Sequence, residues 1–314
     1  MSFTETKKGF ESKSVELQTK LQLYMMLVSN RDESKLTDER EEALINALMQ
    51  THPEESMVYT IQTDFLLRKG KLTEGRVSLL KAIELGNNDY MLWERLLFVD
   101  NELQDWTALT EHSKKAVALF PNQPNIYLLG GIANIQLEKY NDAITVLDEG
   151  IDYIVDNQPL KGQFLMLKGE ALYKLNKIDD AFKLFDRSVE LSPDNYIGLN
   201  NYAYYLSIAD RDLDKAERMS AKVIQRFPDN STYLDTYAWV LFKKGNYTLA
   251  KFYMESALKN SAESSAVMFE HYGDILFMLN KPEEAKQYWE KAVKNGGTSE
   301  ILKRKIKENK YISE

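Results

Sequence analysis

A small side chain recurs about every 34 residues in this 314-residue chain, and this period constrains the fold more than any other feature. From Ala216 to Ala250 is 34 residues, and from Ala250 to Ala285 is 35. Each of these alanines follows a tyrosine-small residue pair by twelve or thirteen positions. A fixed period of this length indicates stacked helix pairs rather than one globular core, because each pair buries its apolar face against the next.

The same frame can be followed through seven units. The position at the start of each second helix, usually a small residue, falls on Gly75, Leu109, Ala143, Ala181, Ala216, Ala250 and Ala285. A second small position lies twelve or thirteen residues earlier, at Thr63, Leu97, Gly131, Gly169, Ala203, Ala238 and Gly273. We expect two helices to cross most closely at these positions, where a larger side chain would cost about 1–3 kcal/mol. The second unit carries leucine at both positions, which predicts a wider crossing.

One long interval and the residues in the turns lead to two local predictions. The interval from Ala143 to Ala181 is 38 residues, which predicts four extra residues near 151–160, in a longer second helix or a longer loop. Residues in the turns between paired helices are predicted to have positive φ, since glycine or asparagine stands there. These residues are Gly70, Asn176, Gly245 and Asn280.

The chain is predicted to have four parts. They are a flexible tail at 1–12, an atypical helical pair at 13–53 with Thr37 as an N-cap, seven repeats at 54–298, and a C-terminal helix with a tail at 299–314. Ile301, Leu302 and Ile306 would place an apolar face of the last helix on the final repeat, as the ends of a repeat array require. Its basic residues, among them Lys305, are interpreted as a solvated face.

The composition excludes several classes of function. A net charge of −8 argues against nucleic acid as a partner. The chain contains no cysteine and no apolar run long enough to span a membrane. His52, His112 and His271 have no metal-ligand spacing and are interpreted as surface or groove-edge side chains. We therefore predict no catalytic residue, no cofactor, no metal site and no enzymatic activity.

These residues resemble the tetratricopeptide repeat, whose 34-residue pattern contains an aromatic residue, Leu-Gly, Tyr, Ala, Phe, Ala and Pro. The resemblance covers seven units, from about Glu54 to Gly297. It implies an all-α, right-handed superhelical solenoid of antiparallel helix pairs, with an N-terminal capping pair and a C-terminal capping helix. It also implies a scaffold or adaptor that binds an extended or helical segment of another protein in its concave groove.

In that family, fixed positions of each first helix face the groove. Carried onto this chain, they give Phe98, Glu170, Tyr173, Asn200, Asn201, Tyr204, Asp235, Trp239, Phe242, Asp274 and Phe277. Tyr173, Tyr204, Trp239 and Phe277 form an aromatic row in consecutive units, with packing against neighbouring helices as the alternative for each. Because aromatic residues are frequent binding anchors and acids outnumber bases here, we expect an apolar or basic partner segment. A clamp for a C-terminal carboxylate is not expected, because Thr232 and Thr236 stand where Lys and Arg are needed.

The last three units also resemble bacterial outer-membrane lipoproteins that act as adaptors for an envelope protease. The resemblance lies in the segments 199–206, 233–241 and 271–274 and in Trp289. It implies an envelope adaptor that presents substrates to a protease, and a self-assembling structural protein is a further alternative. The chain is expected to be cytoplasmic as written, or periplasmic or outer-membrane-associated if it is a domain of a longer exported precursor. Its oligomeric state stays open.

Overall fold

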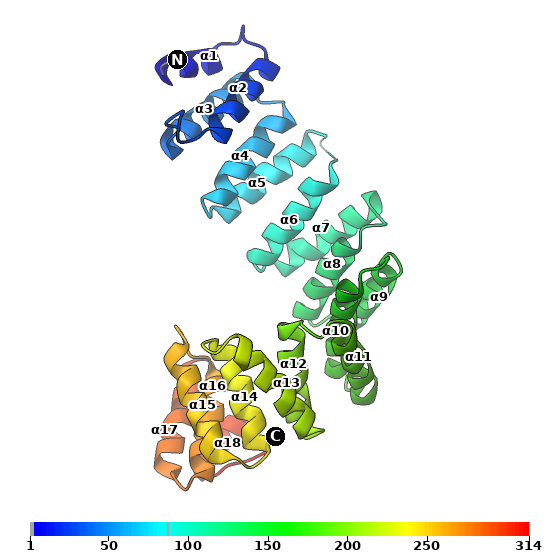
Figure 1. Ribbon diagram of the computed structural model, residues 1–314, viewed down its shortest axis with the longest axis vertical. Coiled ribbons are helices and arrows are strands. Elements are labelled where there is room, and N and C mark those ends of the chain that lie inside the picture. The colour runs from blue at the N-terminus through cyan, green and yellow to red at the C-terminus, as the bar shows by residue number, and fades with distance from the viewer. Residues whose placement is uncertain (1–2, 87, 314) are drawn as a thin grey trace. The chain divides into compact units, whose positions relative to one another are not determined.

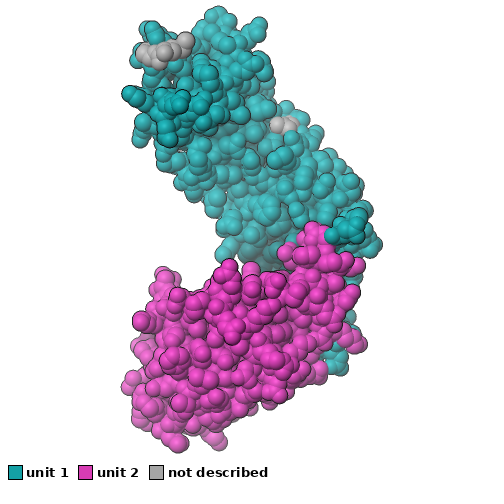
Figure 2. Space-filling model, viewed as in Figure 1, with its two compact units in different colours: residues 1–156, 167–181 teal, residues 157–166, 182–314 magenta. Residues whose placement is uncertain are grey.

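The computed structural model describes residues 3–86 and 88–313, and the regular elements of this part of the chain are all α-helices (Figure 1). The predicted all-α helical repeat solenoid is therefore confirmed. The chain divides into two compact units (Figure 2). The N-terminal unit comprises residues 1–156 and 167–181, and the C-terminal unit comprises residues 157–166 and 182–314.

Seven helix pairs follow the frame predicted from the sequence. In chain order they are α4 (Ser56–Arg68) and α5 (Leu72–Glu84), α6 (Tyr90–Glu102) and α7 (Trp106–Leu119), α8 (Pro124–Gln136) and α9 (Tyr140–Ile151), α10 (Gln158–Lys174) and α11 (Ile178–Leu191), α12 (Tyr196–Ile208) and α13 (Leu213–Arg226), α14 (Ser231–Lys243) and α15 (Tyr247–Asn260), and α16 (Ala266–Met278) and α17 (Pro282–Lys294). A final helix, α18 (Glu300–Glu308), follows the last pair.

The close crossings predicted from the small residues are present. Ala216, Ala250 and Ala285 are fully buried at the starts of their helices. At Gly273 in α16, an added Cβ would lie 2.5 Å from the Trp289 ring and 3.0 Å from the Ala285 carbonyl oxygen. Backbone therefore approaches backbone at this crossing, and only glycine fits without a shift.

The turns between paired helices have the predicted backbone conformation. φ is +71° at Gly70, +60° at Asn176, +81° at Gly245 and +61° at Asn280. The turn between α12 and α13 contains the one extra residue of that unit, and it has two left-handed residues, Asp210 and Asp212. Asp212 then accepts a hydrogen bond from Lys215 N at 3.2 Å, which caps α13.

The extra residues of the 38-residue interval lie mainly in the first helix of the next unit. The second helix is not longer, as one alternative predicted, but the loop at 152–157 is two residues longer than the loops at 120–123 and 192–195. Helix α10 has 17 residues, whereas α8 and α12 have 13 each. Asn157 explains the early start, because its side chain accepts a hydrogen bond from Leu160 N at 3.0 Å. Gly162 directly follows the added turn, and Ser188 Oγ donates to its carbonyl oxygen at 2.6 Å.

The first residues are also more ordered than predicted. Residues 3–11 form helix α1 (Phe3–Glu11) rather than a flexible tail. Phe3, Thr6 and Phe10 are spaced to share one face, and Phe10 is buried in a core with side chains of α2 (Leu17–Ser29) and α3 (Asp38–Thr51). Helix α3 begins as predicted, because Thr37 accepts a hydrogen bond from Arg40 N at 3.4 Å.

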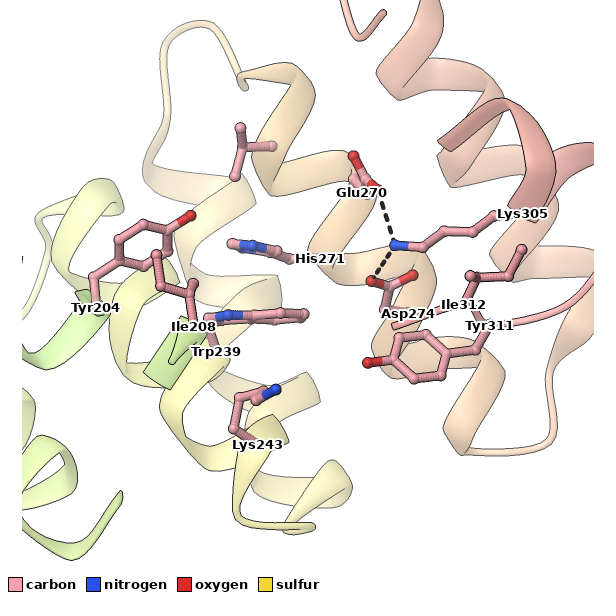
Figure 3. Close-up of a pocket in the computed structure, with 11 residues that line it drawn as sticks. Tyr204, Ile208, Trp239, Lys243, Glu270, His271, Asp274, Lys305, Tyr311 and Ile312 are labelled. Carbon is pink, nitrogen blue, oxygen red and sulfur yellow. Dashed lines mark hydrogen bonds and ion pairs between the residues drawn. The ribbon is translucent and has the colours of Figure 1, made fainter. Parts of the chain in front are cut away.

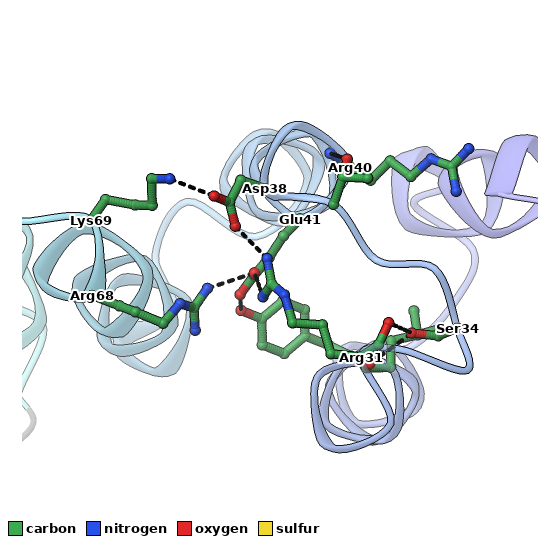
Figure 4. Close-up of polar contacts among 10 residues, drawn as sticks. Arg31, Ser34, Asp38, Arg40, Glu41, Arg68 and Lys69 are labelled. Atoms are coloured by element: carbon green, nitrogen blue, oxygen red, sulfur yellow. Dashed lines mark hydrogen bonds and ion pairs between the residues drawn. The ribbon is translucent and has the colours of Figure 1, made fainter.

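A buried carboxylate connects the first helices of the N-terminal unit (Figure 4). Glu41 of α3 accepts hydrogen bonds from Tyr24 Oη at 2.7 Å and from Arg31 and Arg68 at 2.5 Å each. Burial by itself would raise the pKa of Glu41, but the hydrogen bonds from Arg68, Tyr24 and Arg31 hold that pKa below its usual value. The carboxylate thus stays charged while it joins α2, α3 and α4.

Candidate functional site

Side chains of the first helices α12, α14 and α16 line two neighbouring depressions in the C-terminal unit. One has a volume of about 100 Å³ and lies between Tyr204, Trp239, His271, Asp274, Lys305 and Tyr311 (Figure 3). The other has a volume of about 250 Å³ and is lined by Asn200, Asn201, Thr232, Asp235 and Thr236. Tyr204 and Val267 border both depressions, so we treat them as one surface, called here the inner face.

A stack of rings forms the apolar part of the inner face. The Trp239 indole lies parallel to the His271 imidazole, with centroids 3.9 Å apart and planes 12° apart (Figure 3). Phe242 stacks on the same indole at 4.7 Å and 11°. His271 Nδ1 is 2.9 Å from Asp235 Oδ1, and this hydrogen bond joins α16 to α14. The hydrogen bond and the two stacks hold the indole in one orientation.

Two polar atoms of the inner face are buried without a hydrogen-bond partner among the described residues. They are Trp239 Nε1, a donor on α14, and Asn200 Oδ1, an acceptor on α12. The two side chains are 8% and 5% exposed. Because buried polar atoms in folded proteins nearly always have partners, these two atoms are exceptions that call for an explanation.

An ion pair attaches the C-terminal helix to the edge of the inner face. Lys305 of α18 is buried, contrary to the prediction of a solvated basic face, and its Nζ lies 2.7 Å from Asp274 Oδ2 and 2.8 Å from Glu270 Oε1. Trp289 Nε1 donates to the other Asp274 oxygen at 2.9 Å. Burial raises the pKa of the Asp274 carboxyl to about 6, although Lys305 acts in the opposite direction.

The segment that follows α18 turns back onto the same surface. Tyr311 and Ile312 border the smaller depression beside Trp239 (Figure 3). The Tyr311 ring meets Phe242 edge to face, with centroids 5.6 Å apart and planes 72° apart. Residues that follow the predicted cap therefore contact the helices predicted to bind a partner.

Six of the eleven predicted groove residues lie together on the inner face. These are Asn200, Asn201, Tyr204, Asp235, Trp239 and Asp274. Phe242 is buried beneath the stack, and Phe277 packs against Trp289 with centroids 5.9 Å apart. Phe98, Glu170 and Tyr173 belong to the N-terminal unit, where Phe98 is 48% exposed. Of the predicted aromatic row, the inner face thus contains Tyr204 and Trp239.

The sequence interpretation missed His271, Lys305 and Tyr311. His271 borders a depression of the inner face, as the groove-edge alternative predicted, but it is only 6% exposed because it lies between Trp239 and Asp235. A signal for Lys305 was present, since it follows Ile301 by four residues and Leu302 by three, and so shares their apolar face. Tyr311 lies beyond the helix, where no periodic pattern predicts its contacts.

The depressions of the inner face are small. Both depressions are smaller than the roughly 300–1,000 Å³ of typical small-molecule sites. Within the residues that the structure describes, no group of three or more His, Asp or Glu side chains is arranged to hold a metal ion. Over the same ranges, none of the helices combines the length and the apolarity that a membrane span needs.

Comparison with known proteins identifies the repeat. The sequence pattern of the tetratricopeptide repeat matches residues 128–196 and again residues 232–263. A TPR repeat-containing protein of Borreliella burgdorferi is 29% identical over 94 residues, which is 30% of this chain and 39% of that protein. The chain therefore spans well under half the length of this relative.

Two solved structures share the fold over most of the chain. A tetratricopeptide repeat protein from Parabacteroides merdae superposes with a TM-score of 0.62 at 18% identity, covering 81% of this chain and 98% of that one. The Cut9–Hcn1 hetero-tetramer of the APC/C contains a chain with a TM-score of 0.61 at 14% identity, covering 88% of this chain and 54% of that one. At these identities the likeness shows the fold alone.

Proposed function

Because this chain is a tetratricopeptide repeat protein, we propose that it is a non-enzymatic scaffold that binds an extended segment of another protein on the inner face. Proteins with this repeat serve in general as platforms for protein–protein contact. The proposal assigns that role to one surface of this chain, formed by α12, α14 and α16 in the C-terminal unit.

The observation that supports it most strongly is the pair of buried, unpaired atoms Trp239 Nε1 and Asn200 Oδ1. An unsatisfied buried polar atom costs about 1–3 kcal/mol, so a ligand that pairs both atoms recovers that free energy. An extended backbone offers what they lack, because each residue supplies a carbonyl oxygen and an N–H group. The side chains of Asn201, Thr232 and Thr236 border the same depression as Asn200 and offer further hydrogen bonds.

The charges of the inner face favour an apolar segment over a basic one. Asp274 and Glu270 are already paired with Lys305, and Asp235 is hydrogen-bonded to His271. A cation from a partner would therefore compete with contacts that these acids already make within the chain. The rings of Tyr204 and Trp239 remain as anchors, and buried aromatic side chains at the centre of an interface often contribute about 2 kcal/mol or more.

A displayed library of random peptides tests the proposal. Peptides are selected on the whole chain, and their Kd is measured on the chain and on a Tyr204→Ala, Asn201→Ala variant. We expect at least about tenfold weaker binding to the variant, which corresponds to about 1.4 kcal/mol. Phe252→Ala is the matched control, since Phe252 on α15 is 60% exposed and lies outside the inner face. Selected peptides that bind all three proteins equally well would refute the proposal.

A further inference from the structure

We infer that Tyr311 and Ile312 occupy the place of a partner's side chains, and that a partner binds by displacing them from the inner face. The inference rests on the proposed function and adds the chemistry that is recognised. The partner is an extended segment in which an aromatic residue is followed by a branched aliphatic residue. The chain itself thus contains a competitor for its binding surface.

Helix α18 holds Tyr311 and Ile312 close to the inner face, because the helix itself is firmly packed. We call this helix the anchor. Leu302 is fully buried in the core of the last repeat, and Lys305 is buried between Asp274 and Glu270. Ser299 caps the helix by accepting a hydrogen bond from Leu302 N at 3.0 Å. At the other end, Asn309 adopts the left-handed conformation with φ +46°, and Lys310 N donates to Lys305 O at 3.2 Å. The anchor therefore fixes where the next residues begin.

The residues after the anchor are held less firmly than the helix. Tyr311 and Ile312 are half-buried, whereas Leu302 is fully buried. The Tyr311 ring meets Phe242 edge to face and also lies 5.6 Å from Lys305 Nζ. Since stabilisation by apolar burial scales with the area removed from water, the two residues can leave the surface at a lower cost than α18.

When Tyr311 and Ile312, called here the tail, lie on the inner face, one hydrogen-bond donor of that face still has no partner among the described residues. Trp239 Nε1 has no hydrogen-bond partner among the described residues, although Tyr311 and Ile312 border the same depression. The tail thus supplies apolar contact without an acceptor for the indole. A partner segment that presents both an aromatic ring and a backbone carbonyl gains a hydrogen bond that the tail does not make, and this difference allows it to replace the tail.

Tethering explains how such a weak contact can still compete. A short flexible link gives a local concentration in the millimolar range, so a segment with a millimolar Kd is bound for a substantial fraction of the time. A free partner then binds with its affinity reduced by the fraction of open molecules. Removing the two side chains should abolish this reduction.

The test adds a synthetic peptide with the sequence of residues 307–313 to the whole chain and to an opened variant, Tyr311→Gly, Ile312→Gly. We expect the peptide to bind the opened variant with a Kd near the millimolar range. It should bind the wild type more weakly, by a factor of up to about five. A peptide in which both apolar residues are serine is the negative control. Failure of the original peptide to bind the opened variant, or equal binding by the serine peptide, overturns the inference.

Peptides from the random library separate this inference from the proposed function. They should bind the opened variant more tightly than the wild type, by the same factor as the 307–313 peptide, and Lys310→Ala should leave their Kd unchanged. Equal Kd values for the wild type and the opened variant would overturn displacement while the proposed function stands. If no library peptide binds either protein but the 307–313 peptide binds the opened variant, the proposed function fails and the recognition of paired apolar residues is retained.

Discussion

The indole ring of Trp239 lies 3.9 Å from the imidazole ring of His271, and the same imidazole is hydrogen-bonded to Asp235 at 2.9 Å. These three side chains come from two consecutive first helices, α14 and α16. The contact therefore fixes both the spacing of two repeats and the orientation of the ring that we assign to partner binding. The proposed function therefore implies that stability and partner binding are coupled at this point of the surface.

Replacing His271 separates the stack from the hydrogen bond. His271→Phe keeps a ring against Trp239 but leaves Asp235 without its donor, so the C-terminal unit should lose about 1–3 kcal/mol of unfolding free energy. Urea unfolding, followed by tryptophan fluorescence, measures the loss. The double variant Asp235→Leu, His271→Phe should lose less than the sum of the two single variants, and strict additivity would show that the pair is not coupled.

The close crossing of α16 and α17 predicts that Gly273 tolerates substitution poorly, and Gly9 in α1 is a glycine for comparison. Gly273→Ala should destabilise the C-terminal unit by about 1–3 kcal/mol, because its Cβ would meet the Trp289 ring at 2.5 Å. Gly9→Ala should instead be neutral or stabilising by up to about 1 kcal/mol, since nothing lies within 4 Å of the added atom and Gly9 is inside α1. Equal unfolding midpoints for Gly273→Ala and wild type would contradict the close crossing.

The fold was largely predictable because the repeated residue pattern predicts where the helices begin, end and cross. The small residues at positions such as Gly273 and Ala285 predict which backbones approach, and the inward face of α12 and α14 follows from the same frame. The site was predictable only where it follows that frame. His271 and Asp235 are 36 residues apart, and their contact depends on ring orientation, which no period encodes. Tyr311 lies in a non-helical segment, and α1 was missed because a nine-residue amphipathic stripe is short.

The buried carboxylate of the N-terminal unit predicts sensitivity to acid. The pKa of Glu41 is below its usual value of 4.5, so its stabilisation is complete above that pH and is lost as the pH falls through the lower, folded-state pKa. Glu41→Gln should cost about 1.5–3 kcal/mol at neutral pH, the range for a charge-assisted hydrogen bond, and should remove this acid-dependent loss. Chemical unfolding at several pH values measures both effects. Glu42→Gln is the control, since Glu42 is exposed, and an equal effect there would contradict the prediction.

Asp274 predicts the opposite pH dependence for the C-terminal unit. Burial raises its pKa from 3.8 to about 6, so the folded state holds a proton more tightly than the unfolded chain. The contribution of Asp274 to the unfolding free energy is therefore greatest below pH 3.8, falls as the pH rises to about 6, and is constant above that. Protonation of Asp274 at the same time weakens its ion pair with Lys305, since Lys305 lowers the pKa of that carboxyl.

A Trp93→Phe, Trp106→Phe background tests this dependence, because the remaining tryptophans, Trp239 and Trp289, both lie in the C-terminal unit. Unfolding midpoints are compared between pH 4 and 7 with and without Asp274→Asn. The substitution should make the unfolding midpoint depend less on pH. An unchanged dependence would mean that groups other than Asp274 cause it.

The hydrogen-bonding state of the Trp239 indole tests the central claim most directly. The Nε1–H resonance of Trp239, assigned through a Trp239→Phe variant, is followed by NMR while a library-selected peptide is added. We predict a downfield shift that saturates with peptide binding, while the Trp289 resonance stays in place because its Nε1 already donates to Asp274 at 2.9 Å. A peptide that binds without moving the Trp239 resonance would contradict the inner face as the partner-binding surface.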